Sequence, residues 1–504
     1  MTWGDLQEAL LGRGLMRPEG IGQGATPAAA VTGVAYDSRT VEPGHVFVAL
    51  KGVRADGATF VRQAVERGAI AIVSERPAPP GIGVGWSQVT DARLALAVLA
   101  ASFHRHPSGE MQVIGITGTN GKTTTAYLIA SIFEAAGIRC GLLGTVAYRI
   151  GDEVRESIHT TPEAPDVQQL LREMVDKGCG ACAMEASSHA LALRRVDGTT
   201  FSAAVFTNLT RDHLDFHLDM ETYFQAKRRL FDMLPPGAPG LINTDDPKGA
   251  ALVEIAGRPI TYAINRPADI TPGPLSFTLD GLAFDVRTPR GTLHVRSKLV
   301  GRPNVYNILA AVSTAVAIGL PFDVIEQGLL ALDGVPGRFE VVSSPADEIT
   351  VVVDYAHTDD ALRNLLETAR PLARGRVITV FGCGGERDRT KRPLMGAVAG
   401  RLSDLIVITS DNPRGEDPDR IIEEIQRGIT PDTRRDSSQR ILAIADRLDA
   451  VTKAIELARA GDLVLLAGKG HEKYQVIGDE QVPFDDAAIA REALARRRTN
   501  SGVV

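Results

Sequence analysis

A lysine and a threonine stand directly after a glycine-rich turn, where their side chains could serve a phosphate group. Residues 113–117 are apolar, Gly118 and Gly121 follow, and Lys122 and Thr123 begin a segment with helical apolar spacing. Glycines let backbone N–H groups close on phosphate oxygens, and the N-terminus of a helix favours an anion. Lys122 would then reach the β- and γ-phosphates of a nucleoside triphosphate, and the hydroxyl of Thr123 would face Mg²⁺.

The turn departs from the regular phosphate-loop pattern. That pattern, G-x-x-x-x-G-K-[ST], needs a glycine five positions before Gly121, and Ile116 stands there. We still expect phosphate binding, because strand, turn and helix follow one another in the required order. The alternative is an ordinary glycine turn with a surface lysine. The residues predicted to bind the nucleotide here are Gly118, Thr119, Asn120, Gly121, Lys122, Thr123 and Thr124.

Two acidic residues could complete such a site. Glu185 ends the apolar run 181–184, and Asp354 ends another run much later in the chain. An acid at the carboxyl end of a parallel strand faces the crevice where ligands bind, although either residue alone could be a solvated strand end. The loop predicts a nucleoside triphosphate but no particular reaction. The guanine-reading motif N-K-x-D is absent from the sequence.

The elements that must position these residues predict an α/β fold in three domains. Apolar runs alternate with helical segments from residue 113 onward, which indicates a mainly parallel sheet with crossover helices. The polar stretch 103–112 indicates a linker, and Pro and Gly recur at 332–342. We predict a small N-terminal α/β domain (1–107), a central P-loop ATPase domain (108–337) and a C-terminal Rossmann-like α/β domain (338–504).

Composition supports this division and excludes some function classes. A chain of 504 residues with 44% hydrophobic residues exceeds what one core serves. The formal charge of −7, with Lys and Arg spread along the chain, argues against a nucleic-acid or membrane-surface binder. No apolar run of signal-peptide or membrane-spanning length stands out, so a cytoplasmic protein is expected. Four cysteines make no disulfide framework, and Cys182 is expected in a buried strand rather than in a redox pair with Cys179.

Four apolar runs of the last domain end in polar or glycine-rich loops. These loops are residues 354–357, 382–392, 411–414 and 468–472. In a parallel sheet such ends share one crevice. The loops mix several arginines with Asp411 and Glu472, as a ligand with both carboxylates and amines would need.

An ordered set of motifs carries a resemblance over nearly the whole chain. In order, "GITGTNGKTTT", "MEASSHAL", "NLTRDHLDFH", "RPNVYN", "GRFEVV" and "DYAHTDDAL" resemble the Mur ligase family. Members of that family join amino acids to a UDP-linked cell-wall precursor. The resemblance implies that ATP phosphorylates a carboxylate to an acyl phosphate, which an amine then attacks. The protein's task would be positioning and charge neutralisation.

The resemblance also implies a metal site. It assigns Mg²⁺ to Thr123 and Glu185, with His213 near a second ion, and it implies that Lys227 is carbamylated to give an oxygen ligand. Carbamylation needs a neutral amine and hence a depressed pKa. The residues alone favour a solvated helical Lys227. His213 and His217 have the spacing of a zinc pair, but no H-E-x-x-H motif joins them, so zinc is disfavoured.

Further nucleotide and precursor contacts are implied by the same resemblance. Asn304, Arg338 and Asp354 match nucleotide contacts, so closure of the third domain would complete the ATP site. Taken alone, Asn304 would be a helix cap, Arg338 would be part of a surface ion pair, and Asp354 would be the end of a strand. The residues matching contacts to the UDP-precursor are Ser38, Val53, Arg54, Ala55, Thr160, Thr161, Ser187 and Arg195. Leu193 stands where a relative can carry a glutamine, so one polar contact is missing or supplied elsewhere.

The last loops resemble the diaminopimelate-adding branch of the family. The residues implied to hold the amino acid are Arg392, Asp411, Asn412, Pro413, Arg414, Gly468 and Glu472, with Arg414 on the distal carboxylate. The expected reaction adds meso-2,6-diaminopimelate to the D-Glu of UDP-N-acetylmuramoyl-L-Ala-D-Glu, by a monomer with ATP and Mg²⁺ and no nucleic-acid or membrane partner. Alternatives are a lysine-adding or folylpolyglutamate synthase-like ligase, and, from another class, a P-loop kinase or ATP-binding switch.

Overall fold

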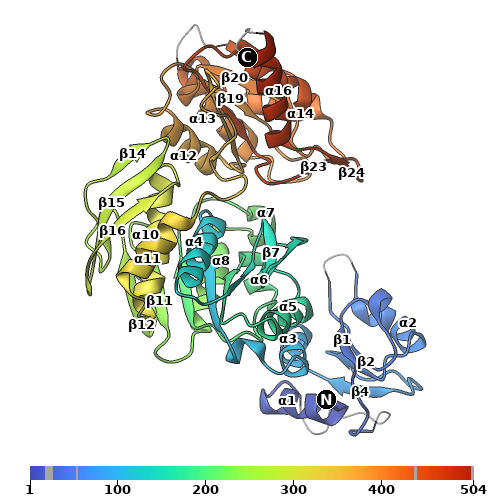
Figure 1. Ribbon diagram of the computed structural model, residues 1–504. Coiled ribbons are helices and arrows are strands. Elements are labelled where there is room, and N and C mark those ends of the chain that lie inside the picture. The colour runs from blue at the N-terminus through green and yellow to red at the C-terminus, as the bar shows by residue number, and fades with distance from the viewer. Residues whose placement is uncertain (17–25, 53–54, 436–439, 501–504) are drawn as a thin grey trace.

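The structure, a computed structural model, describes residues 1–16, 26–52, 55–435 and 440–500. Its sheets and helices form three α/β units that follow one another along the molecule (Figure 1). The N-terminal unit (blue) lies at one end, and the C-terminal unit (orange to red) lies at the other. The predicted fold class, three α/β domains with mainly parallel sheets, is therefore confirmed.

The N-terminal unit is a four-stranded parallel sheet in the order β1-β2-β3-β4. One face packs on the first and third helices, and the other packs on the second. Its strands are β1 (Gly33–Ala35), β2 (His45–Val48), β3 (Ala71–Ser74) and β4 (Gly85–Gln88), and its helices are α1 (Trp3–Gly12), α2 (Val61–Glu66) and α3 (Ala92–Phe103).

The central unit has an eight-stranded sheet in the order β12-β11-β10-β5-β9-β6-β7-β8. Only the β6-β7-β8 edge is antiparallel. The strands are β5 (Gln112–Thr117), β6 (Cys140–Leu143), β7 (Ala147–Ile150), β8 (Glu153–Glu156), β9 (Ala181–Glu185), β10 (Ala203–Phe206), β11 (Pro239–Asn243) and β12 (Arg258–Tyr262). The middle strands are buried on both faces, which explains their continuous apolar sequences.

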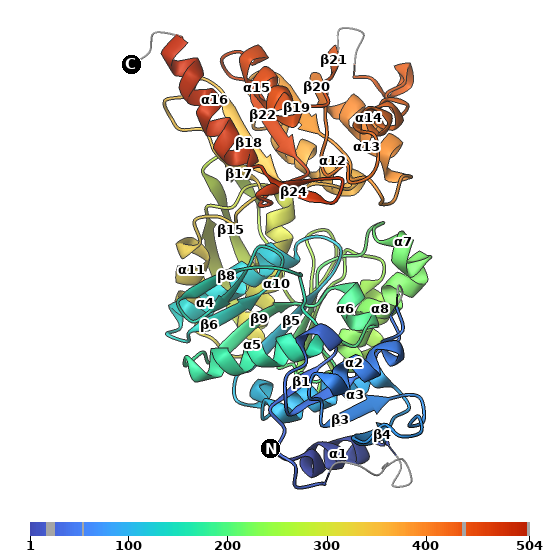
Figure 2. The ribbon, with the colours of Figure 1, turned by 90° about the vertical axis from the view of Figure 1, so that its right-hand side faces the viewer.

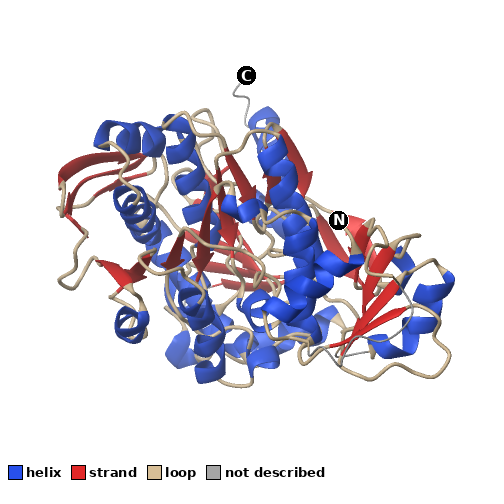
Figure 3. Ribbon diagram, turned by 90° about the horizontal axis from the view of Figure 1, so that it is seen from below, coloured by secondary structure: helices blue, strands red, loops and turns tan. Residues whose placement is uncertain are grey.

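Helices cover both faces of this sheet, as Figure 3 shows from below. The helices α4 (Lys122–Ala135), α10 (Arg302–Ala317) and α11 (Phe322–Ala331) build one core. The other face carries α5 (Ala164–Asp176), α6 (Ser188–Ala192), α8 (Met220–Asp232) and α9 (Gly249–Ile255), with α7 (Leu214–His217) beside α8. Leu128, Ile129, Ile132 and Phe133 of α4 are buried as their spacing predicts, so the helix after Lys122 is confirmed.

A small antiparallel sheet was not expected from the sequence. It contains β13 (Thr271–Pro272), β14 (Ser276–Thr278), β15 (Gly281–Thr288) and β16 (Gly291–Ser297). Buried and exposed residues alternate along β15 and β16, because one face packs against the core around α10 and α11 and the other faces solvent.

The C-terminal unit has a six-stranded sheet in the order β17-β18-β22-β19-β20-β21, antiparallel only at β17. Its strands are β17 (Glu340–Val341), β18 (Thr350–Asp354), β19 (Val377–Phe381), β20 (Leu405–Ile408), β21 (Arg440–Ala443) and β22 (Leu463–Ala467). One face carries α12 (Asp359–Ala369), α13 (Lys391–Leu402) and α14 (Pro418–Gln426), and the other carries α15 (Arg447–Leu457) and α16 (Asp486–Asn500), as Figure 2 shows. A hairpin, β23 (Tyr474–Ile477) and β24 (Glu480–Pro483), precedes α16.

None of the helices in the described ranges has the length and apolar character needed to cross a membrane. The four cysteines are free and buried, and Cys182 lies within β9 as predicted. Burial raises the pKa of the Cys182 thiol well above its usual value, which makes it a core residue rather than a nucleophile.

Candidate active site

The glycine-rich turn leaves β5 and enters α4 with two residues in the left-handed region. Gly118 has φ of +148° and Gly121 has φ of +87°. A Cβ atom at Gly118 would lie 1.8 Å from Oγ1 of Thr207, and one at Gly121 would lie 2.3 Å from Oδ1 of Asn307. Both positions therefore require glycine.

The turn is held from outside by residues that follow β10. The backbone N–H of Asn120 donates to Oδ1 of Asn208 at 2.9 Å, and the hydroxyl of Thr207 donates to the carbonyl of Asn120 at 2.6 Å. The hydroxyl of Thr119 lies 3.1 Å from that of Tyr223. Because these contacts fix the backbone, the loop has its shape before any ligand arrives.

Two lysines meet at one carbonyl oxygen of this turn. Nζ of Lys122 donates to the carbonyls of Gly118 (3.0 Å) and Thr119 (2.9 Å), and Nζ of Lys227 on α8 donates to Gly118 at 2.8 Å. Lys227 is only 1% exposed and lies over the ring of Tyr223. Burial, and then the nearby Lys122, lower the pKa of Lys227 well below its ordinary value. The alternative of a solvated Lys227 is wrong.

Glu185 lies at the carboxyl end of β9, beside the turn. Its carboxylate accepts hydrogen bonds from the backbone N–H (2.8 Å) and the hydroxyl (3.1 Å) of Thr145. The residue is 1% exposed, so it is no solvated strand end. The hydroxyl of Thr160 lies 3.1 Å from that of Thr145, which connects this predicted precursor residue to Glu185.

The other predicted precursor residues of the central unit adjoin Glu185. The hydroxyl of Thr161 donates to the Glu185 carbonyl at 2.7 Å, and Arg195 donates to the Thr161 carbonyl at 3.0 Å. Ser187 accepts from the N–H of Ala190 and so caps α6, yet its hydroxyl also lies 3.2 Å from that of Thr161. The structure thus brings Thr160, Thr161, Ser187 and Arg195 together.

Ser38 lies in the N-terminal unit, away from this cluster along the chain. Its hydroxyl donates to Oε1 of Gln63 at 2.7 Å, in a short turn capped by Asp37. Ala55 accepts a backbone hydrogen bond from Gly52. Val53 and Arg54, predicted with it, lie outside the described residues.

Three histidine rings pack together near Lys227. His213 adopts a left-handed conformation before α7, and its ring packs edge-on against that of His189, with 4.8 Å between the ring centroids. Burial is the main cause that lowers the pKa of His213 to about 3. Nε2 of His217 lies 2.9 Å from the hydroxyl of Ser188, so this nitrogen is engaged in a hydrogen bond with Ser188. Within the described ranges no three His, Cys, Asp or Glu side chains gather as a metal site.

One predicted nucleotide residue reaches the turn from the far side of the predicted domain boundary. Arg338 donates to the hydroxyl of Thr123 at 3.1 Å and lies over the ring of Tyr355 at 4.6 Å. Asp354 instead accepts from the N–H groups of Phe339 and Ala356, which orders the segment that carries Arg338. Arg338 and Asp354 were both predicted as nucleotide contacts, but only Arg338 donates to the turn, while Asp354 binds backbone N–H groups of its own unit.

Asn304 contacts the turn only through a neighbour. Its Oδ1 accepts from Nδ2 of Asn307 at 2.8 Å, and the hydroxyl of Thr125 donates to Oδ1 of Asn307 at 3.5 Å. Asn307 is therefore the residue of α10 nearest the turn, and the sequence analysis missed it. Its one available signal was its place as the last residue of "RPNVYN".

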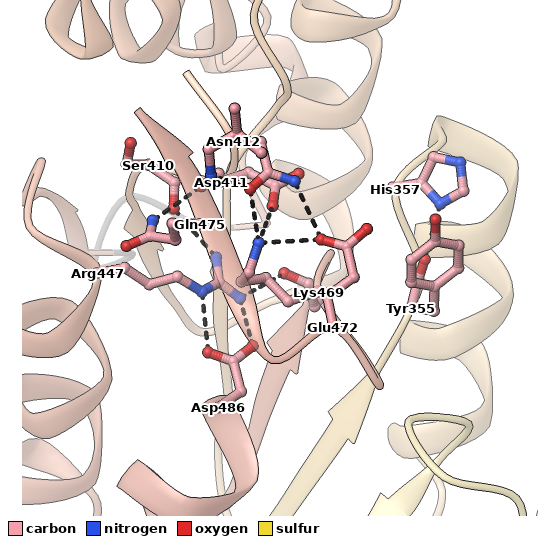
Figure 4. A network of polar contacts seen from close by, with 12 residues as sticks. Tyr355, His357, Ser410, Asp411, Asn412, Arg447, Lys469, Glu472, Gln475 and Asp486 are labelled. Atoms are coloured by element: carbon pink, nitrogen blue, oxygen red, sulfur yellow. Dashed lines mark hydrogen bonds and ion pairs between the residues drawn. The ribbon is translucent and has the colours of Figure 1, made fainter. Parts of the chain in front are cut away.

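The loops predicted to hold the amino acid meet beyond the carboxyl ends of β20 and β22. Asp411, Asn412 and Glu472 gather around the buried Nζ of Lys469, which the sequence analysis did not select (Figure 4). Gly468, with φ of +114°, donates its N–H to the carbonyl of Asp354 at the end of β18. These contacts join the loops after β18, β20 and β22, while the sharing of one crevice by all four loops stays a prediction.

Arg414 and Arg392 occupy different positions. Arg414, with φ of +50°, follows Pro413 and donates to the carbonyl of Gly385 at 2.9 Å. Arg392 has no exposed side-chain surface and binds Glu416 and Glu424 at 2.9 Å each. Its guanidinium also donates to the carbonyl of Gly384. Arg392 therefore braces the loop after β19.

Comparison with known proteins agrees with this arrangement. Family models match for the Mur ligase family, catalytic domain (residues 30–104), the Mur ligase middle domain (116–315) and the Mur ligase, glutamate ligase domain (337–470). The UDP-N-acetylmuramoyl-L-alanyl-D-glutamate--2,6-diaminopimelate ligase of Geobacter sulfurreducens is 48% identical over 487 residues, covering 93% of this chain and 95% of that protein. The chain belongs to the Mur ligase family.

Two further relatives bear the same name. The UDP-N-acetylmuramoyl-L-alanyl-D-glutamate--2,6-diaminopimelate ligase of Geobacter metallireducens is 47% identical over 494 residues, covering 94% of this chain and 96% of its own. A solved structure of an enzyme of this name has a TM-score of 0.68 at 32% identity and covers 99% of both chains. The predicted membership of the Mur ligase family is confirmed.

The oxygen donors at this Mur ligase turn fit a hard cation. The hydroxyl of Thr123 and the carboxylate of Glu185 are oxygen ligands of the kind that Mg²⁺ prefers. Lys122 and Arg338 lie beside them and carry positive charge that complements a triphosphate. The site can therefore hold a triphosphate with its metal ion.

Proposed function

We propose that this chain is an ATP-dependent, ADP-forming ligase that adds meso-2,6-diaminopimelate to the D-Glu of UDP-N-acetylmuramoyl-L-Ala-D-Glu, in cytoplasmic peptidoglycan precursor synthesis. One observation carries the proposal. The Arg338 contact to Thr123 joins the glycine-rich turn to a domain whose loops carry both cationic and anionic side chains. The names of the relatives that match most of this chain support the same reaction.

The chemistry begins at the free carboxylate of D-Glu. One carboxylate oxygen attacks the γ-phosphorus of ATP, ADP leaves, and an acyl phosphate forms. The amine of the amino acid then attacks the carbonyl carbon, giving a tetrahedral intermediate that loses a proton and expels inorganic phosphate as the amide forms. Lys122 and Arg338 neutralise the phosphates, and the ordered turn orients them. Bound Mg²⁺, held by Thr123 and Glu185 with His213 nearby, would supply charge neutralisation.

Lys227 is proposed to be carbamylated. A neutral amine adds to CO₂ and loses a proton, which converts a cation into an oxygen-bearing anion. The lowered pKa of Lys227 makes the neutral amine available, because the site buries the amine beside Lys122, where it donates to the Gly118 carbonyl. The carbamate would join the metal-binding oxygens of this turn.

The amino-acid crevice suits an acceptor with a zwitterionic distal end. Arg414 is proposed to bind the distal carboxylate, while Glu472 and Asn412 face the ammonium group. Asp411, Pro413 and Gly468 shape the loops that carry them. Arg392 would act through the Gly384 carbonyl that it binds. A lysine side chain lacks the distal carboxylate, so Arg414 would favour diaminopimelate over lysine.

The precursor would lie between the first two units. Its UDP part is assigned to the segment of Ser38, Val53, Arg54 and Ala55, and its peptide end to the cluster at Glu185 formed by Thr160, Thr161, Ser187 and Arg195. Asn304 and Asp354 are assigned to the ATP site together with Gly118 to Thr124. We place the domain boundaries after residues 107 and 337, and we propose a monomer.

The test is an assay with purified protein, ATP, Mg²⁺, the UDP-dipeptide and single amino acids, read by phosphate release and by mass spectrometry of the product. Phosphate release and a new amide with diaminopimelate, and neither with lysine, are expected. Amide formation with lysine alone would indicate the lysine-adding alternative. Phosphate release without an amino acid would indicate an ATPase switch, and a stable phosphorylated product would indicate a kinase.

A further inference from the structure

Lys469 is a buried cation at the centre of the amino-acid crevice, in the loop after β22. Its side chain has no exposed surface. Nζ lies 2.9 Å from Oδ1 of Asn412, 3.0 Å from Oε2 of Glu472 and 3.4 Å from Oδ1 of Asp411. Figure 4 shows the ammonium between the loop of Asp411 and Asn412 and the carboxylate of Glu472. The three donor positions of an ammonium group are thus matched by three oxygens.

These contacts fix the orientation of the Asn412 amide. Oδ1 of Asn412 accepts from Nζ of Lys469 and from the backbone N–H of Val476 at 3.0 Å. Nδ2 then points to Oε2 of Glu472 at 3.0 Å. A flipped amide would set its NH₂ group against two donors and its oxygen against a carboxylate. Lys469, together with the N–H of Val476, therefore fixes which end of the Asn412 amide points toward Glu472.

The charges around Lys469 leave a surplus of negative charge. Two carboxylates, Asp411 and Glu472, surround one ammonium. Burial by itself would raise the pKa of Asp411, but Lys469 and Arg447 outweigh it and hold that pKa below its usual value. The two carboxylates thus outnumber the one ammonium among these three side chains, which suits a cationic group of a ligand.

A second buried cation fixes the two loops from below. Arg447 donates to the carbonyl of Ser410 at 3.3 Å and to that of Ala467 at 3.1 Å, which are the residues before Asp411 and Gly468. Asp486 on α16 balances its charge. The carboxyl ends of β20 and β22 are therefore held together, and Lys469 acts within a fixed frame.

We propose that Lys469 is a positioning residue that orients Asn412 and Glu472 toward the ammonium group of the amino-acid acceptor. This inference rests on the proposed function, because it assumes that an amino acid binds in this crevice. Lys469 itself does not touch the acceptor. Its loss would weaken acceptor binding without changing the glycine-rich turn or the precursor cluster at Glu185, which lie in the central unit.

The first variant is Lys469→Met, which keeps the length of the side chain and removes its charge. The matched control is Lys473→Met, since Lys473 stands four residues on in the same segment and makes only an exposed pair with Asp485. Steady-state kinetics should show KM for diaminopimelate raised about 10- to 100-fold in Lys469→Met, from the loss of hydrogen bonds to a buried charge. KM for ATP and for the UDP-dipeptide should stay within about twofold, and the control should match the wild type.

The second variant keeps the test decisive if Lys469→Met does not fold, as judged by circular dichroism and thermal melting. Asn412→Asp retains both contacts to Oδ1 but sets an oxygen against Glu472, so the same rise in KM for diaminopimelate is expected with Lys469 in place. An unchanged KM for diaminopimelate in a folded variant would overturn the inference. Equal rises for all three substrates would also overturn it. A wild-type protein that forms no amide would instead refute the proposed function.

Discussion

Arg211, in the loop after β10, connects the central unit to the C-terminal unit. Its guanidinium donates to the hydroxyl of Thr390 at 2.7 Å and pairs with Asp359 at 3.2 Å and Asp388 at 3.4 Å. All three partners belong to the C-terminal unit, and Asp388 and Thr390 lie in the loop that leads to Arg392. We predict that Arg211→Ala weakens the docking of this unit on the phosphate-binding turn.

The magnitude follows from exposure and geometry. The Arg211 side chain is 29% exposed, and Asp359 and Asp388 are 17% and 19% exposed, so solvent screens both ion pairs in part. Such pairs contribute roughly 0.2–1 kcal/mol each, and the hydrogen bond to Thr390 adds about 1 kcal/mol. A total of about 1.4–3 kcal/mol corresponds to a roughly 10- to 150-fold lower ratio of docked to undocked protein.

The assay compares Arg211→Ala with Arg228→Ala. Arg228 is a partly exposed arginine of α8 whose pair with Asp232 stays within the helix, so its loss should leave docking unchanged. Arg211→Ala should lower kcat/KM for diaminopimelate about 10- to 150-fold and raise the radius of gyration measured by small-angle X-ray scattering. A double-mutant cycle with Thr390→Ala should give a coupling energy of about 0.5–1 kcal/mol. If Arg211→Ala behaves like the control in both measurements, or the coupling is zero, the docking role is refuted.

Three further outcomes are expected. Lys227→Ala should lower the rate of amide formation about 10- to 100-fold. ¹³C NMR with ¹³CO₂ should show a carbamate signal in the wild type that the variant lacks. The absence of this signal from active wild-type protein would contradict carbamylation. Asp486→Asn should lower the free energy of unfolding in urea by about 3–5 kcal/mol, because it leaves Arg447 buried without its anion; a change below about 1 kcal/mol would refute this. Burial alone would raise the pKa of Asp462, but hydrogen bonds led by Arg376 hold it below 3.8. As the pH falls, the Asp462 carboxyl therefore takes up a proton in the unfolded chain before it does so in the folded protein. The stabilisation that this carboxylate contributes at neutral pH is lost as the pH falls through its pKa in the folded protein. Asp462→Asn should flatten the acid limb of the melting temperature against pH, and an unchanged slope would count against it.

Much of the fold could be predicted because its elements carry strong local patterns. The turn between β5 and α4, the strand β9 and the four strands that end at the amino-acid crevice all show continuous apolar runs, which burial between two helix layers requires. The sheet of β13 to β16 escaped notice because half of its residues face solvent and its first strands are short. Neither the strand order of the sheets nor the position of β22 between β18 and β19 is encoded locally.

The site was predicted less evenly than the fold. The glycines of the turn can be predicted from the sequence, since close approach and positive φ both exclude a side chain at Gly118 and Gly121. The surroundings of long cationic side chains cannot be predicted in this way, because partners far along the chain determine them. Arg392 shows this: its motif suggested a ligand contact, yet Glu416 and Glu424 enclose its guanidinium. Lys469 escaped selection because nothing in its local sequence signals a lysine without exposed surface.

One buried lysine, Lys227, lies at the glycine-rich turn, and another, Lys469, lies in the loop after β22. Their different neighbours give the two amines different chemistry. Lys469 has two carboxylates within 3.4 Å and an amide oxygen besides, so its ammonium is matched by anions and orders the loops around it. Lys227 has a carbonyl oxygen and a second lysine as neighbours, and the more distant charge of Asp212 offsets burial only in part. The free energy of burying an unpaired ammonium is relieved when the amine loses its proton. Burial alone therefore does not make a lysine reactive. Among the described residues no carboxylate pairs with Lys227, which favours its proposed reaction with CO₂, whereas the two carboxylates at Lys469 suit that lysine to its proposed positioning role.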